Sequence, residues 1–510
     1  MNDIAQTCLW SRLSAAQRSR WFLYRLDPDS QGRHNNVFSA RVHGELDQER
    51  LRAAIQRLIS KHPMLRMRFR DVDGQPEQSV SASIKTPLEI VDATGLDDET
   101  LLKRIKKDAV VPFDLDGGAL IRVVLYKTAQ HDSILMLAFD HIAVDGWSYW
   151  LLLHELSEML LEDCTHEDVA EDGDAGFLEY VRWQDDWMKS QAADKQRMYW
   201  KQCLSGDDVV LQLPTDRPPT ARLGVRETVT VMLPMALSVA LRELSKKHAG
   251  TLFTTLLAAY QILLFRYTGQ DDISVGSPMP GRTRSGLDGI VGDFVNPVVF
   301  KKQFLVGETV SEVLRSVRSS ALRGVANQEY PFSALVEELR PLRSPGHHPF
   351  YQTMFVFQNA RKGHDLRALW DPSSPDVHVA FGNVQLSPYP VYQGGGADAM
   401  RLQLEAIELD HGIRCDFNFD SAVFDRSTID RLVNAWVKVL DGMVRDDSQP
   451  VHALSLLSPD EREQVLEAFN ATERPYPRDR CIHELFEAQA LSTPEAVALV
   501  YEDQRLSYAE

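Results

Sequence analysis

The sequence has few cysteines, no excess of basic residues and no long apolar run. Its five cysteines are odd in number and far apart, which indicates neither a disulfide framework nor a zinc site. A net charge of −18 excludes nucleic acid as the main partner. No segment reaches the roughly 20 apolar residues of a membrane span, and the opening MNDIAQTCLW lacks a signal-peptide pattern. We therefore expect a cytoplasmic protein that binds no metal.

Composition divides the 510 residues into four parts. The stretch EDCTHEDVAEDGDAG is acidic and poor in large apolar residues, which is typical of a linker, and the chain becomes polar again from about residue 446. Strands and helices alternate on both sides of the acidic stretch. We expect a first lobe, a second lobe, a linker, and the start of another domain too short to close its own core, with bounds 1–175, 176–446, 447–480 and 481–510.

The stretch from 133 to 160 carries the candidate chemistry. SILMLAF predicts a buried strand, DHIAVDGWSY a polar loop, and the spacing of apolar residues after it a helix. A strand followed by a helix N-terminus presents one side chain beside unpaired N–H groups, and His141 has a pKa suited to proton transfer. The structural alternative, a buried histidine with Asp145 or Ser148 as an N-cap, stays open on these residues alone.

Seven segments, taken in order, make the chain resemble a condensation domain of a nonribosomal peptide synthetase, followed by the start of an adenylation domain. The segments are LSAAQRSRWFL (13–23), KHPMLRMRF (61–69), DHIAVDGWS (140–148), YVRWQ (180–184), VGDFVNP (291–297), NQEYPF (327–332) and HHPFYQTMFVFQN (347–359). The resemblance implies an α/β (α+β) fold of two lobes, each like chloramphenicol acetyltransferase. These lobes form a V-shaped pseudodimer with a tunnel at the seam.

The implied activity is that of an acyltransferase. An aminoacyl amine on a peptidyl carrier protein attacks a donor acyl thioester, linked to phosphopantetheine or to coenzyme A, and no cofactor is bound covalently. The resemblance assigns the catalytic roles to His141 and to the N–H of Gly146. It makes Asp145 structural, with Arg282 as its partner and Arg284 as the next candidate. The residues assigned to the tunnel wall are Trp147, Ser148 and Asn296.

Asp140 stands where the family usually has a first histidine. Asp140, Asp145 and Ser148 match the DxxxxDxxS pattern of heterocyclisation domains, but those domains normally lack the histidine found here at 141. They also lack the FVN and NQ segments, so an ordinary condensation domain is favoured. We expect Asp140 to form local hydrogen bonds and to raise the pKa of His141. Ser148 is disfavoured as a nucleophile because no GxSxG motif surrounds it.

The donor substrate defines the remaining alternatives. The first family segment begins about a dozen residues after Met1, which favours a starter domain that N-acylates its acceptor with a fatty acyl group from acyl-CoA, in antibiotic or lipopeptide biosynthesis. An elongation domain would instead take a peptidyl or polyketide chain from a donor carrier protein. A non-catalytic domain that recruits partner enzymes is the third possibility. The adenylation domain is expected to be a partner in the same chain.

Overall fold

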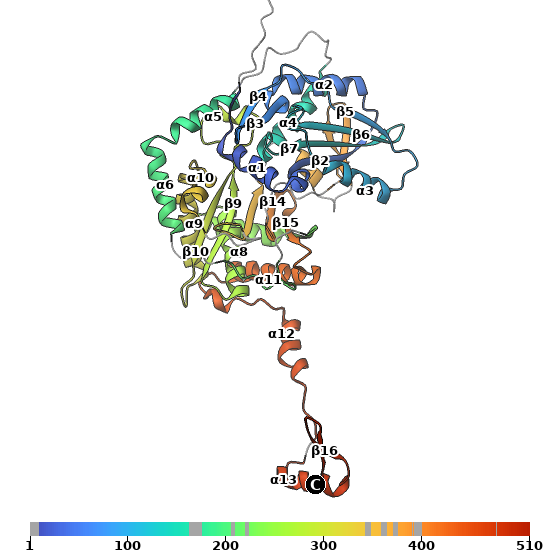
Figure 1. The fold of residues 1–510 in the computed structure, drawn as a ribbon, viewed down its shortest axis with the longest axis vertical. Coiled ribbons are helices and arrows are strands. Elements are labelled where there is room, and N and C mark those ends of the chain that lie inside the picture. The colour runs from blue at the N-terminus through green and yellow to red at the C-terminus, as the bar shows by residue number, and fades with distance from the viewer. Residues whose placement is uncertain are drawn as a thin grey trace, which may run out of the picture. The chain divides into compact units, whose positions relative to one another are not determined.

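The computed structural model describes residues 10–162, 176–205, 210–219, 224–341, 348–358, 365–370, 376–389, 391, 400–475 and 477–510. It divides the chain into two compact units, Met1–Leu456 and Leu457–Glu510. The larger unit contains two six-stranded sheets (Figure 1). The acidic stretch expected to separate the lobes falls on residues 163–175, which lie outside the described residues.

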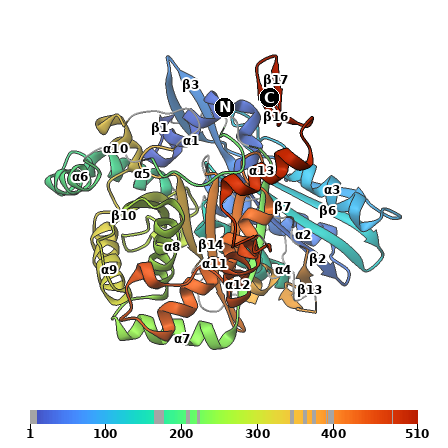
Figure 2. The same cartoon turned by 90° about the horizontal axis from the view of Figure 1, so that it is seen from below.

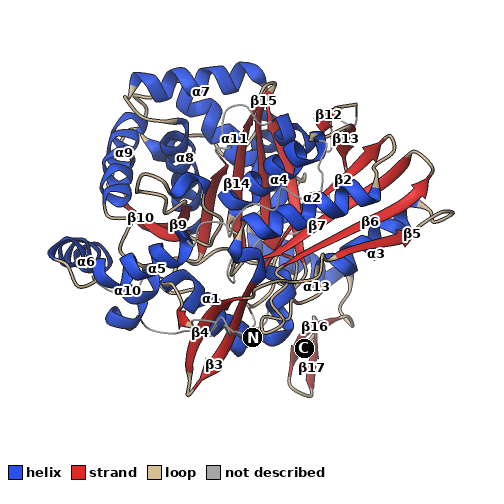
Figure 3. Cartoon of the chain, turned by 90° about the horizontal axis from the view of Figure 1, so that it is seen from above, coloured by secondary structure: helices blue, strands red, loops and turns tan. Residues whose placement is uncertain are grey.

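The first sheet has the order β12-β13-β2-β7-β6-β5, antiparallel except for β5 with β6. β7 is buried on both faces, which explains its unbroken apolar run. Helices α2 and α4 cover one face, α3 covers the other, and Figure 3 shows α2 lying across the strands. The bounds are β2 Asn35–His43, β5 Leu88–Asp92, β6 Ile121–Ala129, β7 Asp132–Asp140, β12 Val379–Phe381, β13 Val384–Pro388, α1 Ala15–Leu26, α2 Gln48–Lys61, α3 Asp98–Ala109 and α4 Gly146–Leu161.

The first half of the chain also contains a small three-stranded sheet with the order β1-β4-β3. In the sequence, β1 precedes β2, and β3 and β4 lie between β2 and β5. The small sheet consists of β1 Ser11–Arg12, β3 Met67–Val72 and β4 Gln75–Val80, with the short helices η1 Pro28–His34 and η2 Pro63–Arg66 nearby in the chain. Ser14 caps α1 through a capping box with Gln17.

The second sheet has the order β10-β9-β11-β14-β15-β8, with β11 parallel to both of its neighbours. Helices α7, α8, α9 and α11 share one core with it, and Figure 2 shows them gathered along this sheet. The strands are β8 Arg226–Leu233, β9 Asp272–Met279, β10 Asn296–Gln303, β11 Thr353–Gln358, β14 Leu402–Leu409 and β15 Gly412–Asp420. The helices are α5 Gly176–Trp187, α6 Gln191–Leu204, α7 Met235–Lys247, α8 Leu252–Thr268, α9 Val310–Ala326, α10 Phe332–Leu339 and α11 Arg426–Arg445, with η3 Leu287–Gly289, η4 Asp365–Trp370 and η5 Val451–Ala453.

Two segments cross from the second half of the chain to the first sheet. Strand β13 pairs with β2, so β12 and β13 complete a sheet that sequence boundaries assign to residues 1–175. The loop between β9 and β10 sends Leu287, Val291 and Phe294 into the core formed by α2, α4 and the first sheet. The two mixed α/β halves are therefore interlocked.

Two predicted boundaries differ from the structure. The sequence from 176 to 204 predicts one long helix, but the chain breaks after Trp187 because Ser190 starts a new helix, its side chain accepting from the N–H of Ala193. The expected linker at 447–480 begins too early, because Val451 and Leu454 are each 1% exposed in the second core. The larger unit thus extends to Leu456.

The smaller unit contains α12 Pro459–Leu466, η6 Ala468–Asn470, α13 Ile482–Ser492 and the hairpin β16 Val497–Tyr501 and β17 Gln504–Ser507. Among the described residues, no single helix has both the length and the apolar character to cross a bilayer. Helices α7 and α8 meet those criteria only when joined, and they are bent by 101° at their junction.

Candidate active site

The strand, loop and helix that the sequence predicts around His141 are present. β7 ends at Asp140, whose carbonyl accepts from the N–H groups of Ala143 and Val144 to form a tight turn. α4 then begins at Gly146, and the Asp145 carboxylate caps it by accepting from the N–H of Ser148 at 2.7 Å. The turn fixes the backbone of His141 between a central strand and a helix N-terminus.

His141 is held by a charged pair from two distant parts of the chain. Nη2 of Arg20, on α1, donates to His141 Nε2 at 3.1 Å, and Arg20 Nε donates to Asp293 Oδ2 at 2.7 Å. The other Asp293 oxygen, Oδ1, lies 3.9 Å from His141 Nδ1. Burial and the Arg20 cation lower the pKa of His141 to about 3. The imidazole is therefore neutral at physiological pH.

Asp140 is fully buried and forms its own hydrogen bonds. Its Oδ1 accepts from the Tyr24 hydroxyl and from the N–H of Ile142, both at 2.9 Å, which confirms the predicted local hydrogen bond. Burial raises the pKa of Asp140. The expectation that Asp140 raises the pKa of His141 is wrong, because burial and Arg20 dominate and lower that pKa instead.

The predicted ion pair between Asp145 and Arg282 is confirmed. Arg282 Nη2 donates to Asp145 Oδ1 at 3.1 Å and to Oδ2 at 3.3 Å. The Asp145 side chain is 0% exposed and the Arg282 side chain is 2% exposed. Arg282 Nη1 donates to the carbonyls of Leu287 and Ile290. Arg284 is exposed and lies over the Trp183 ring instead. The pair holds the β9–β10 loop against the start of α4.

Ser148 and Trp147 bind the same loop. The Ser148 hydroxyl accepts from Arg282 Nη2 and from the N–H of Gly292, and it donates to the Gly292 carbonyl at 3.0 Å. Ser148 is therefore neither the N-cap nor placed as a nucleophile. Trp147 Nε1 donates to the Asp288 carbonyl at 3.0 Å, so this side chain also anchors the loop.

Asn296, expected in the tunnel wall, holds a loop of the second half. Its Nδ2 donates to the carbonyls of Gln328 and Tyr330, and its Oδ1 accepts from the N–H of Phe332, all at 2.8 Å. These contacts use both ends of the amide, so Asn296 acts as a structural residue here.

Gly146, in contrast, is exposed as the first residue of α4, and a Cβ placed there would meet no atom within 4 Å.

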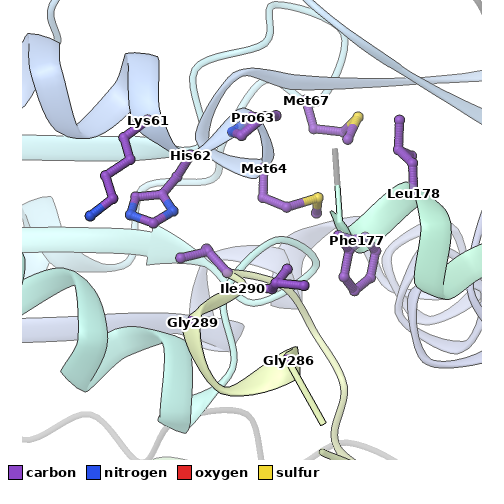
Figure 4. Close-up of a pocket in the computed structure, with 11 residues that line it drawn as sticks. Lys61, His62, Pro63, Met64, Met67, Phe177, Leu178, Gly286, Gly289 and Ile290 are labelled. Carbon is purple, nitrogen blue, oxygen red and sulfur yellow. The ribbon is translucent and has the colours of Figure 1, made fainter. Parts of the chain in front are cut away.

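A cavity of about 370 Å³ lies near the seam, but it does not include His141. Figure 4 shows its lining, which comes from the end of α2 and the turn after it, the start of α5, and the loop around η3. Its residues are Lys61, His62, Pro63, Met64, Met67, Phe177, Leu178, Gly286, Gly289, Ile290 and Val291. A tunnel past His141 stays a prediction. In the described part of the chain, no group of three or more His, Cys, Asp or Glu side chains is arranged to hold a metal ion.

Sequence reasoning missed Arg20 and Asp293. Both lie inside family-like segments, but neither was assigned a role. A signal was present on α1, where Gln17, Arg20 and Tyr24 share one helix face and are all buried. Three polar side chains on a buried helix face indicate a polar network beneath it.

Comparisons with known proteins give one consistent result. A family model described as "Condensation domain" matches residues 11–466. A linear gramicidin synthase from Brevibacillus parabrevis is 35% identical over 507 residues, which cover 98% of this chain and 6% of that protein. Malpinin synthetase from Mortierella alpina is 32% identical over 503 residues, which cover 98% of this chain and 6% of that protein. The chain thus spans a small fraction of the length of these relatives.

Solved structures agree on the fold. Holo-AB3403, a four-domain nonribosomal peptide synthetase bound to AMP and glycine, gives a TM-score of 0.82 at 20% identity, covering 100% of this chain and 39% of that one. The X-domain from teicoplanin biosynthesis gives a TM-score of 0.75 at 23% identity, covering 88% of this chain and 97% of that one. A mutant of the starter condensation domain of rhizomide synthetase, in complex with C8-CoA, gives a TM-score of 0.71 at 20% identity. This match covers 88% of this chain and 98% of that one.

Proposed function

Because this chain belongs to the condensation-domain family of nonribosomal peptide synthetases, we propose that it forms an amide bond between two thioester substrates. The amine of a carrier-bound aminoacyl thioester attacks the carbonyl of the donor acyl thioester. The new C–N bond replaces the C–S bond, and the amine proton leaves with the donor thiol.

The observation that carries this proposal is the neutral, buried His141 beside the start of α4. A group whose pKa is about 3 is a poor general base near pH 7, where a base with a pKa near the operating pH works best. An α-amine has a pKa of about 8, so part of it arrives neutral and needs orientation more than proton removal. We therefore assign His141 the role of orienting the amine.

The exposed N–H of Gly146 is our candidate for oxyanion stabilisation. It is the first N–H of α4, where helix N–H groups have no partner inside the helix and the helix dipole favours negative charge. The missing side chain leaves room for a carbonyl oxygen to approach. A donor in this position stabilises the charge that develops in acyl transfer.

For the donor, we propose a fatty acyl group from acyl-CoA. Its support is the shared fold with a starter condensation domain that was solved with C8-CoA. For the acceptor, we propose a peptidyl carrier protein. We also propose that residues 481–510 begin an adenylation domain, because the smaller unit leaves apolar side chains such as Ile482, Leu491 and Tyr501 at least 72% exposed and in need of cover.

Mass spectrometry of the acceptor carrier tests the proposal. Carrier protein loaded with candidate amino acids is mixed with acyl-CoA of varied chain length and with wild-type, His141→Ala or His154→Ala protein. His154 lies on α4, the helix that follows His141, and its side chain is 41% exposed, so it is the matched control. We expect N-acylation with wild type and control, and a rate about 100-fold lower with His141→Ala.

Other outcomes identify the alternatives. Product from a peptidyl or polyketide carrier but from no acyl-CoA would indicate elongation. An additional mass loss of one water would indicate heterocyclisation. No product from wild-type protein with any donor would contradict the enzymatic proposal and favour a recruiting role.

A further inference from the structure

Arg20 and Asp293 reach His141 from opposite sides of the interlocked fold. Arg20 belongs to α1, near the start of the chain, and Asp293 to the loop between β9 and β10. The Asp293 side chain is 1% exposed and that of Arg20 is 11% exposed. The 2.7 Å ion pair between them fixes the guanidinium, whose Nη2 then meets His141 Nε2 at 3.1 Å.

The direction of the hydrogen bond between Arg20 and His141 follows from chemistry. A guanidinium has five N–H donors, no acceptor, and a charge that it keeps at every pH of interest. His141 Nε2 must therefore accept, and the single proton of the neutral ring must lie on Nδ1. That Nδ1 faces Asp293 Oδ1 at 3.9 Å, so the ring is oriented between the two charges of one pair.

We infer that Arg20 is a positioning residue for His141. Anchored by Asp293, its guanidinium fixes the imidazole as the neutral tautomer that carries its proton on Nδ1 and turns its Nε2 lone pair toward Arg20. Neither ring nitrogen is then available as a base, because Nε2 accepts from Arg20 and the buried Nδ1 carries the proton. This explains at the atomic level why orientation is the role left for His141.

The other charged groups around the ring do not reverse this effect. From the end of β7, Asp140 directs its carboxylate to Tyr24 on α1. Asp145, at the cap of α4, raises the pKa of His141 but is itself paired with Arg282, and His34 on η1 lowers the pKa of His141. Protonation of His141 would place a second cation beside Arg20, and burial makes that unfavourable as well.

Nuclear magnetic resonance with ¹⁵N-labelled histidine tests the inference without any substrate. The chain has 15 histidines, and the His141 signals are identified by their loss in His141→Gln. In wild-type protein we expect the Nδ1–H tautomer, unchanged from neutral pH down to about pH 5. An Nε2–H tautomer, or an imidazolium at neutral pH, would overturn the inference.

Two matched variants separate the effect of Arg20 from the effect of removing any cation from helix α1. In Arg20→Met we expect the pKa of His141 to rise by about one unit or more and the two tautomers to mix, because a nearby cation and its hydrogen bond are gone. Arg18 lies on the same helix and is exposed, so Arg18→Met should leave both readouts at wild-type values. An unchanged pKa and tautomer in folded Arg20→Met would overturn the inference.

The inference deepens the proposed function but can fail separately from it. A wild-type protein that makes no amide bond could still show the Nδ1–H tautomer. Conversely, an active enzyme with the other tautomer would refute the role of Arg20 and leave the condensation activity standing.

Discussion

A single buried histidine makes the stability of this protein depend on pH. The pKa of His141 is about 3 in the folded chain and about 6.5 in an unfolded one. The unfolded chain therefore binds more protons between these values. The stability that His141 contributes is complete above about pH 6.5 and is lost as the pH falls toward 3.

We therefore expect wild-type protein to lose about 1.4 kcal/mol of unfolding free energy between about pH 7.5 and pH 5.5 through His141 alone. Urea unfolding at both pH values measures it, compared with His141→Gln, in which this loss should disappear. His154→Gln, which changes a partly exposed histidine on helix α4, should keep the wild-type loss. Equal losses in wild type and His141→Gln would show that folding does not lower the pKa of His141.

The ion pair between Asp145 and Arg282 is structural, and single substitutions test how much it contributes to the free energy of unfolding. Replacing Arg282 by Met leaves the Asp145 carboxylate buried without its cation, which we expect to cost about 3–5 kcal/mol of unfolding free energy. Arg284→Met is the control because that side chain is exposed, and it should cost less than about 1 kcal/mol. Similar losses in the two variants would refute the assignment of the pair.

The loop between β9 and β10 is the element on which the site depends. It supplies Asp293 to Arg20, Gly292 to Ser148, and Phe294 to the first core. The sequence predicts its contact with α4 only through the Asp145–Arg282 pair. The remaining contacts could not be predicted, because the backbone of Gly292 carries no side-chain signal and Asp293 is separated from Arg20 by 273 residues.

Two glycines of this loop allow its path to be tested. Both have a positive φ, +66° at Gly281 and +88° at Gly286, but a Cβ on Gly281 would lie 1.9 Å from the Phe294 carbonyl oxygen while a Cβ on Gly286 would meet nothing within 4 Å. We expect Gly286→Ala to cost about 1–2 kcal/mol for the backbone conformation alone. Gly281→Ala should cost about 1–3 kcal/mol more because the loop must move.

The measurement for both glycine variants is urea unfolding, with hydrogen exchange of residues 287–294 as a second readout. Faster exchange is expected only in Gly281→Ala. If the two variants were equally destabilised, the close approach of Gly281 to Phe294 would be wrong.

At the scale of the whole molecule, local patterns gave the elements and the family-like segments gave the plan of two mixed α/β halves. The N-cap at Ser14 and the strand, turn and helix around His141 are readable because capping and apolar spacing are local properties. The exchange of β12 and β13 into the first sheet was not predicted. Phe381 and Leu386 are apolar residues that would suit either core, and only the pairing of β13 with β2 decides between them.

At the end of the larger unit, the composition indicates a linker but the structure shows a packed segment. Residues 447–456 are polar enough to resemble a linker, yet they are tied to three helices. Asp447 pairs with Lys247 and His248 at the end of α7, and the carbonyls of Val451 and Leu454 accept from Arg266 on α8. Val310, at the start of α9, donates its N–H to the Gln449 carbonyl.

Truncation distinguishes the two boundaries. A chain that ends at Leu456 keeps every one of these contacts, so we expect it to unfold at the same urea concentration as the larger unit of the full chain. A chain that ends at Asp446 loses the burial of Val451 and Leu454, each worth about 1.5–3 kcal/mol, and leaves the Arg266 guanidinium without its two carbonyl acceptors. We expect it to be less stable by at least about 3 kcal/mol. Equal stability of the two truncated chains would show that the segment after α11 is a linker, as its composition indicates.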